Sequence, residues 1–153
     1  MIGSNLLTPI EIQKPSIMKE EVSIQEAFTS YLNRIEGWKT RCKNLHWSAP
    51  KKNIHVYLDE FNSALDGFED SIAEDYMGIN GKFTPNILNG TSCLALNAVE
   101  LLLEIKKYTE DFYTKIPQDI CYKGICAEIE NFIHIINKYM YLFKLCDYRS
   151  EMY

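Results

Sequence analysis

The chain has 153 residues, 46% of them hydrophobic and 24% charged, a composition typical of one globular domain and not of a disordered chain. Its formal net charge of −5 argues against nucleic acid as the main partner, because phosphate binding needs a clustered basic surface. No apolar run approaches the roughly 20 residues of a membrane span, and the N-terminus lacks the pattern of a secretory signal. The five cysteines include no CxxC pair. We therefore expect a cytoplasmic protein with reduced thiols.

The first helix is expected to follow an extended segment. Residues 1–21 contain two prolines and lack helical periodicity, which predicts an extended N-terminal arm. Ser23 and Glu26 then match a capping box, in which two side chains satisfy the free backbone donors of a helix start. Apolar residues spaced by three and four follow, and they predict a helix over residues 23–47 that Pro50 ends.

Three further helices are predicted along the chain. The second covers residues 53–78 and ends at the pair Asn80-Gly81. The third covers residues 91–115, with its cap in the turn Asn89-Gly90-Thr91-Ser92. The fourth covers residues 122–147, where apolar residues again repeat every three or four positions.

Four amphipathic helices of similar length predict an all-α, four-helix bundle of the ferritin-like class. The bundle is expected to form one domain over residues 22–148, followed by a C-terminal tail over residues 149–153. The connection over residues 79–90 is long enough to cross the bundle, as a ferritin-like topology requires. A plain up-down bundle with a loose loop fits the periodicity equally well.

The second predicted helix carries polar residues on the side away from its apolar stripe. At 100° per residue, His55, Asp70 and Glu74 lie roughly 100° to 200° from that stripe and point away from the subunit's own core. Asp70 and Glu74 are one turn apart, so their carboxylates can converge on one hard cation. His55 precedes Asp70 by fifteen residues, or roughly 22 Å along a helix, so one chain cannot bring all three together.

Two chains can assemble these residues. If the helix pairs antiparallel with a second copy about a two-fold axis near residues 62–63, His55 of one chain faces Asp70 and Glu74 of the other. His46, at the end of the first predicted helix, lies across a short turn from His55 and can join it. Two histidines and two carboxylates suit non-haem iron, mononuclear or di-iron, better than calcium or structural zinc.

Spacing alone leaves a simpler interpretation open. Acidic residues on the outer face of a helix usually form a solvated surface, and histidines near helix ends are often caps. A metal site inside the bundle is not expected, because the usual Glu-x-x-His motif is absent and the nearest candidate, Glu130 with His134, has a spacing of four.

Two stretches carry longer motifs. The first is Lys39-Thr40-Arg41 followed by Asn44-Leu45-His46-Trp47. The second is Asp70-Ser71-Ile72-Ala73-Glu74, and His55 lies fifteen residues before its aspartate. Both resemble motifs of the Dps family, the miniferritins, and the similarity covers residues 28–83.

The resemblance implies a ferroxidase site at a two-fold subunit interface, with His46 and His55 from one chain and Asp70 and Glu74 from its partner as iron ligands. It also implies oxidation of ferrous iron by peroxide or oxygen, for storage or detoxification, in a twelve-subunit shell. The chain departs from the family in the spacing of its histidines, which are nine residues apart where twelve is usual, and in its short 79–90 connection. It also lacks the basic N-terminal tail with which some members bind DNA. We therefore expect no direct DNA binding. The shortened spacing keeps a second function open, that of a ferritin-like oligomeric structural or binding module without ferroxidase activity.

Overall fold

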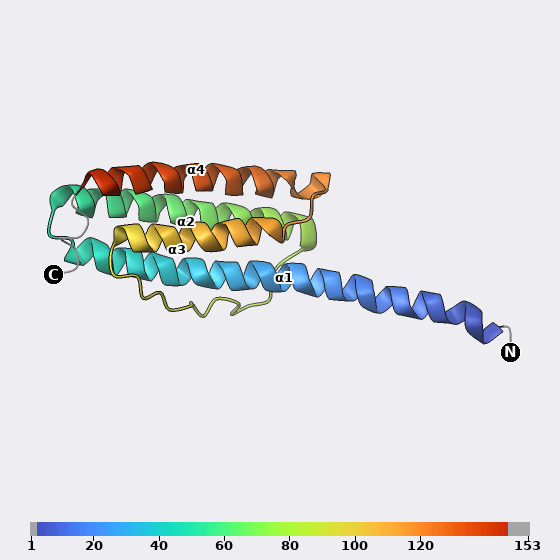
Figure 1. Ribbon diagram of the computed structural model, residues 1–153. Helices are drawn as coiled ribbons and strands as arrows, with labels where there is room; N and C mark the ends of the chain where they lie inside the picture. The colour runs from blue at the N-terminus through green and yellow to red at the C-terminus, as the bar shows by residue number, and fades with distance from the viewer. Residues whose placement is uncertain (1–2, 147–153) are drawn as a thin grey trace.

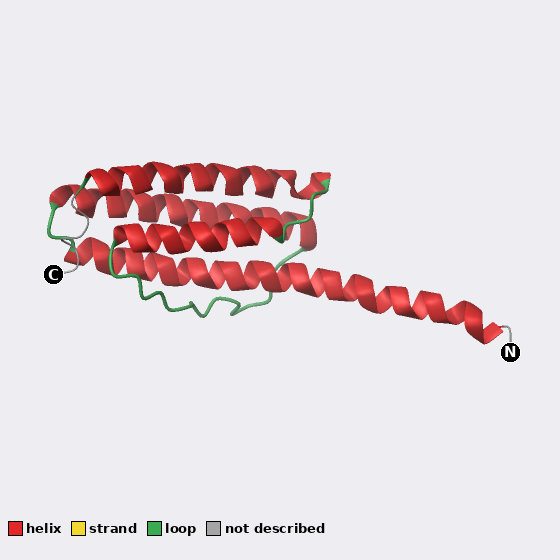
Figure 2. Cartoon of the chain, viewed as in Figure 1, coloured by secondary structure: helices red, strands yellow, loops and turns green. Residues whose placement is uncertain are grey.

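The computed structural model describes the backbone of residues 3–146 and the side chains of residues 24–146. Its elements are α1 (Gly3–Ser48), α2 (Lys52–Asn80), α3 (Ala98–Thr114), a single 3-10 turn η1 (Ile120–Tyr122) and α4 (Lys123–Leu145) (Figure 1). This part of the chain contains no strand, as the colouring in Figure 2 makes plain. The prediction of an all-α, four-helix bundle is confirmed. The predicted end of the last helix at residue 147 and the predicted tail over residues 149–153 lie outside the described residues.

The helices are connected by one long crossover. Both α1 and α4 pack against α2 and α3, so α1 and α4 are diagonal partners. Figure 1 shows α2 and α3 running in the same direction, joined by a loop that follows α1 back along the bundle. This connectivity excludes the plain up-down alternative. It is the connectivity of bundles with one long crossover, the group that includes ferritin-like folds.

The predicted extended arm over residues 1–21 is wrong, because α1 already begins at Gly3. A proline in a helix removes one backbone hydrogen bond, but Glu11, Lys14 and Glu20 around the two prolines are strong helix formers. The helix therefore continues through Ser23, and the capping box does not mark its start. In Figure 1 this first part of α1 projects beyond the ends of the other three helices.

The predicted start of the third helix at residue 91 is also wrong, because α3 begins at Ala98. Its N-cap is Asn97, whose side chain accepts a hydrogen bond from Glu100 N at 3.0 Å. The Glu100 carboxylate in turn accepts from Leu96 N at 2.9 Å. This reciprocal cap satisfies the free donors of the helix start better than the Thr91-Ser92 pair would, so residues 91–97 belong to the crossover loop.

Asn33 and Gly37 of α1 hold the crossover loop against the bundle. The Asn33 amide donates to Ile87 O at 2.9 Å, and its carbonyl oxygen accepts from Gly90 N at 2.9 Å. Thr91 N donates to Asn33 O, also at 2.9 Å. A Cβ on Gly37 would overlap the carbonyl oxygen of Thr91, so only glycine permits this approach of loop and helix.

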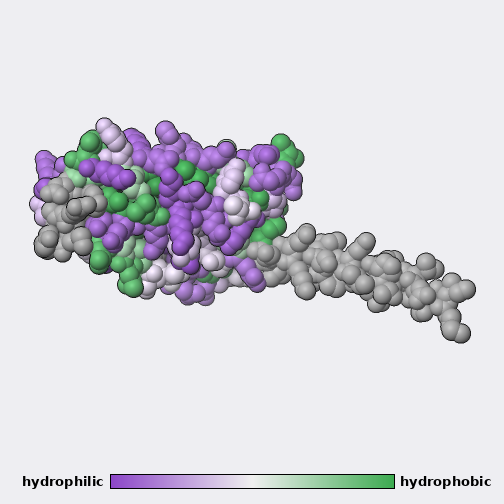
Figure 3. Space-filling view, viewed as in Figure 1, coloured by the Kyte–Doolittle hydropathy of each residue, from purple (hydrophilic) through white to green (hydrophobic). Residues whose placement is uncertain are grey.

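The core is built from the predicted apolar stripes. On α2 the buried residues include the whole stripe from Ile54 to Ile72, and Gly81 with φ 88° ends the helix as predicted. Aromatic rings dominate the centre, where Phe68 stacks on Phe132 with ring centroids 4.1 Å apart. No helix in the described part of the chain has the length and apolar character of a membrane span. Hydrophilic side chains cover most of the face seen in Figure 3, and the hydrophobic ones form separate small patches.

Candidate metal centre

His46 lies in the last turn of α1 and His55 in the first turn of α2, on either side of a three-residue connection. This short connection brings the two imidazoles together. Their rings stack with centroids 3.7 Å apart and an interplanar angle of 17°. The nine-residue spacing between the histidines thus places them side by side.

Each imidazole is held by the backbone of the other histidine. His46 Nδ1 lies 2.6 Å from His55 O, and His55 Nδ1 lies 2.7 Å from His46 O. A carbonyl oxygen only accepts, so each Nδ1 carries the proton, and in the neutral ring the Nε2 lone pair is left to bind a metal. A backbone carbonyl on the second ring nitrogen is a common support for metal-binding histidines.

Asp70 and Glu74 lie one turn apart on α2, and both are exposed. Neither belongs to the buried stripe of α2, and His55 is exposed as well. The prediction that these three side chains point away from the subunit's own core is confirmed. Asp70 and Glu74 are separated from His55 by roughly 22 Å and 28 Å of helix.

A single chain does not assemble the predicted site. In the part of the chain that the structure describes, no group of three or more histidine, cysteine or acidic side chains is close enough to hold a metal ion. The imidazole pair and the carboxylate pair are therefore two separate half-sites on one subunit. The bundle core offers no alternative metal site, because the buried polar or charged residues within 24–146 are Asn97 and Thr109. Glu130 and His134, the nearest candidates by sequence, are both exposed.

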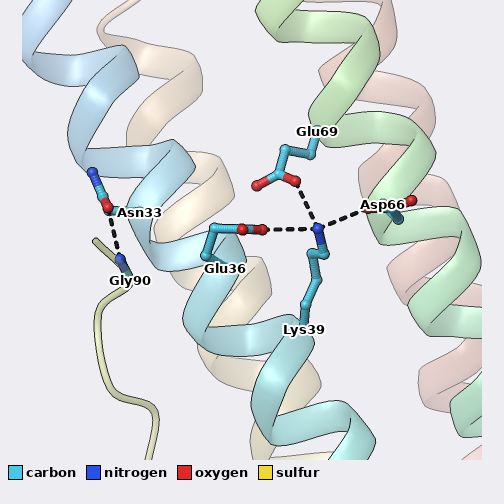
Figure 4. Close-up of polar contacts among 6 residues, drawn as sticks. All are labelled: Asn33, Glu36, Lys39, Asp66, Glu69 and Gly90. Carbon is cyan, nitrogen blue, oxygen red and sulfur yellow. Dashed lines mark hydrogen bonds and ion pairs between the residues drawn. The ribbon is translucent and has the colours of Figure 1, made fainter. Parts of the chain in front are cut away.

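A polar cluster between α1 and α2 was missed by sequence reasoning. In the Lys39 cluster, Lys39 Nζ lies 2.8 Å from Glu36 Oε2, 2.7 Å from Asp66 Oδ1 and 2.9 Å from Glu69 Oε1 (Figure 4). The spacing of three between Glu36 and Lys39 was a signal for the first of these pairs. A second signal was the row of acidic residues on α2, which has no lysine or arginine between Asn53 and Asn80.

Burial and charge shift the protonation of the Lys39 cluster. Burial raises the pKa of Glu69 to about 7; the hydrogen bond and charge of Lys39 oppose this shift, and the neighbouring Glu36 adds to it. Burial by itself would lower the pKa of Lys39, but hydrogen bonds to Asp66, Glu36 and Glu69 outweigh it and raise the pKa overall. The lysine therefore stays charged, while Glu69 titrates near neutral pH.

In the described residues, none of the five cysteines belongs to a group of three or more possible metal ligands. All five lie within the described residues and no disulfide joins them. Cys93 is buried in the crossover loop, and desolvation raises the pKa of its thiol to about 11, so a thiolate ligand is disfavoured there.

The possible metal ligands of this chain lie at two separate places along α2. The chain provides two imidazoles with free Nε2 atoms at one end of α2 and two exposed carboxylates nearer the other end. A comparison with known proteins found no matching family model, no matching curated protein and no matching solved structure.

Proposed function

We propose that this chain is a ferritin-like, Dps-type protein that binds and oxidises ferrous iron at a site shared by two subunits. His46 and His55 of one subunit and Asp70 and Glu74 of its partner would bind the iron. The observation that carries the proposal is the imidazole pair, in which both Nδ1 atoms are tied to backbone carbonyls and both Nε2 atoms are left for a ligand.

The ligand types fit iron that changes its oxidation state. Imidazole nitrogen suits ferrous iron, and a mixture of histidine and carboxylate ligands with open positions is typical of non-haem iron. Carboxylate charge favours the ferric product over the ferrous substrate, because the attraction grows with the charge of the ion. With peroxide as oxidant, each molecule takes one electron from each of two ferrous ions and two protons from solvent, and yields two ferric ions and two water molecules.

The geometry of α2 supports a shared site. His55 and Asp70 lie at equal distances on either side of residues 62–63, so a two-fold axis there would place each His55 opposite the partner's Asp70. His55, Asp70 and Glu74 are exposed and lie outside the buried stripe of α2, where a second copy can reach them. The long crossover between α2 and α3 agrees with a ferritin-like subunit.

The proposal is tested by adding ferrous iron anaerobically, admitting oxygen or peroxide, and following the ferric absorbance together with the particle mass. His55→Ala and Asp70→Ala should each slow oxidation at least about 100-fold with no loss of helix content, because both residues lie off the core. His134→Ala, which removes an exposed histidine from α4, is the matched control and should oxidise iron as the wild type does. With a 17.8 kDa chain, a twelve-subunit shell would have a mass of about 200 kDa.

Mixing the two inactive variants tests whether the site is shared. In a mixed dimer, one site lacks both residues and the other keeps both, so a random mixture should regain roughly a quarter of the wild-type rate. A site built within one chain would regain nothing. Full activity of either variant alone would refute the assignment of its ligand.

One observation favours a second candidate function. The stacked imidazoles and their two backbone hydrogen bonds also lock the turn between α1 and α2, a purely structural role. On this alternative the chain is an oligomeric structural or binding module of ferritin-like fold. Large losses of thermal stability in His46→Ala and His55→Ala, together with no iron oxidation by the wild type, would support it.

A further inference from the structure

A groove lies between α2 and α4, which pack against each other along the bundle (Figure 1). Its volume is about 360 Å³, a size typical of sites for small molecules. Small side chains leave this space open, since Ala64 of α2 and Ala127 of α4 line it. The stacked rings of Phe68 and Phe132 line it as well. The groove therefore offers an apolar, aromatic wall to a ligand.

A carboxyl group lines the same groove. Glu128 of α4 accepts a hydrogen bond from Ser71 Oγ through Oε1, and its Oε2 is buried without a hydrogen-bond partner. Asp75, one turn from Ser71 on α2, lies close enough to Glu128 for a carboxyl–carboxyl contact. Burial raises the pKa of Glu128, the hydrogen bond from Ser71 opposes this shift, and the charge of Asp75 adds to it. Two carboxylates in contact need a proton or a cation between them, so this pair lacks a positive charge.

The described residues do not supply that charge. Among residues 24–146, the ion pairs of Lys39 and Lys115 lie elsewhere, and the Glu128 carboxyl is in contact with Ser71 and Asp75. A metal ion fits poorly, because no third histidine, cysteine or acidic side chain in this part of the chain completes a set of ligands there. An ammonium group donates three hydrogen bonds, which carboxylate oxygens accept, and it can carry an apolar group for which the aromatic wall provides a surface.

We propose that the groove between α2 and α4 binds a small organic amine, with its ammonium on the carboxyl pair of Glu128 and Asp75 and its apolar group against Phe68 and Phe132. A ligand of this class joins an aromatic or branched apolar group to a protonated amine through a short linker. Charge complementarity places the ammonium at the carboxyl pair, and burial of apolar surface holds the ring in the groove. The site uses none of the proposed iron ligands and needs only one subunit.

Isothermal titration calorimetry on the full chain tests the class of ligand with three probes. Phenethylamine carries both the ring and the ammonium and should bind one site per chain with a Kd below about 1 mM. Phenethyl alcohol keeps the ring without the charge, and ethylamine keeps the charge without the ring. Each of these two should bind at least about 10-fold more weakly than phenethylamine.

Other results with these probes would overturn the proposal. No binding of phenethylamine would remove the site, and equal binding of the alcohol would show that the carboxyl pair plays no part. Equal binding of ethylamine would show that the aromatic wall plays no part. Displacement of phenethylamine by magnesium would identify a metal site in place of an amine site.

Three variants test the location of the site. Glu128→Gln should weaken phenethylamine binding at least about 10-fold, because it removes the charge that the ammonium meets. Ala127→Leu should weaken it as much with no change of charge, because the larger side chain fills the groove. Glu130→Gln is the matched control, since Glu130 is an exposed glutamate of α4 that does not line the groove, and it should bind as the wild type does.

Circular dichroism shows whether each variant keeps its helix content. Wild-type binding by folded Glu128→Gln or folded Ala127→Leu would overturn the proposal. An equal loss in Glu130→Gln would overturn it as well, because amines would then bind the acidic chain without a defined site. If both groove variants unfold, the three probes on the wild type decide the question.

Discussion

At the scale of single residues, contacts between α1 and α2 determine the environment of the polar side chains. His46 and His55 each fix the protonated nitrogen of the other through a backbone carbonyl. Lys39 likewise binds three carboxylates from two helices. For the imidazoles, the partner determines which ring nitrogen stays available to a ligand, and both groups depend on contacts between α1 and α2.

Glu69 should make the stability of the protein depend on pH. Its pKa in the folded state is about 7, above the ordinary value of 4.5, so folding favours its protonated form. The stabilisation is fully present below the ordinary pKa of the carboxyl group and is lost as the pH rises through 7. Urea unfolding of the wild type and Glu69→Gln between pH 4 and 9 should show the wild type losing stability relative to the variant across this window.

Asp111→Asn is the control for this measurement, because Asp111 forms an exposed ion pair with Lys115 at 3.1 Å. Its unfolding free energy should follow the wild-type pH profile. Parallel profiles for wild type and Glu69→Gln would show that Glu69 does not titrate near neutral pH.

At the scale of whole elements, the contact between α1 and the crossover loop determines the course of the chain. The loop can follow α1 because Asn33 satisfies its backbone groups and Gly37 leaves room for its carbonyl at Thr91. This contact directs the chain back along the bundle, so that α3 begins at the end where α2 began. The connectivity therefore depends on Gly37, although glycine in the interior of a helix is otherwise unfavourable.

Gly37→Ala should destabilise the protein by about 2–4 kcal/mol, because the added methyl group overlaps backbone atoms that cannot move independently. Gly67→Ala on α2 is a control of opposite sign. A Cβ there meets nothing within 4 Å, and alanine in a helix should add about 0.5–1 kcal/mol. Chemical denaturation of both variants measures the difference, and equal stability of the two would contradict the close approach of loop and helix.

At the scale of the whole molecule, α1 is longer than the bundle to which it belongs. It spans 46 residues against 29 for α2 and 17 for α3, and its first part projects past their ends (Figure 1). Within residues 24–146, whose side chains the structure describes, the buried core begins at Phe28, and Ile24 and Ala27 pack against it. Folding of the bundle should therefore not depend on the projecting part.

A chain that begins at Ser23 should melt within about 3 °C of the full chain, because the removed part of α1 projects beyond the other three helices and Ser23 with Glu26 can then cap the new helix start. Thermal melting followed by circular dichroism measures this. A drop of more than about 8 °C would show that the projecting part of α1 stabilises the bundle.

Local sequence patterns predicted the helices well where a strong signal marked their ends. Pro50 and Gly81 were correctly predicted to end α1 and α2. Proline lacks the backbone N–H that a helix needs, and the positive φ of Gly81 does not fit a helix, so each residue interrupts the helix within one turn. The start of α1 was missed because helix formers carry a helix through the prolines. The start of α3 was missed because the cap at Asn97 and Glu100 was overlooked in favour of the turn before it.

The sequence by itself determined the number of helices, the apolar stripe of each, and the outward placement of His55, Asp70 and Glu74. These follow from the 3.6-residue repeat, which fixes the direction of a side chain relative to its neighbours on one helix. Only the tertiary structure decided the crossover path, the stacking of His46 on His55 and the Lys39 cluster. These contacts join residues on different elements, and their distances depend on how the helices pack and not on the spacing along any one of them.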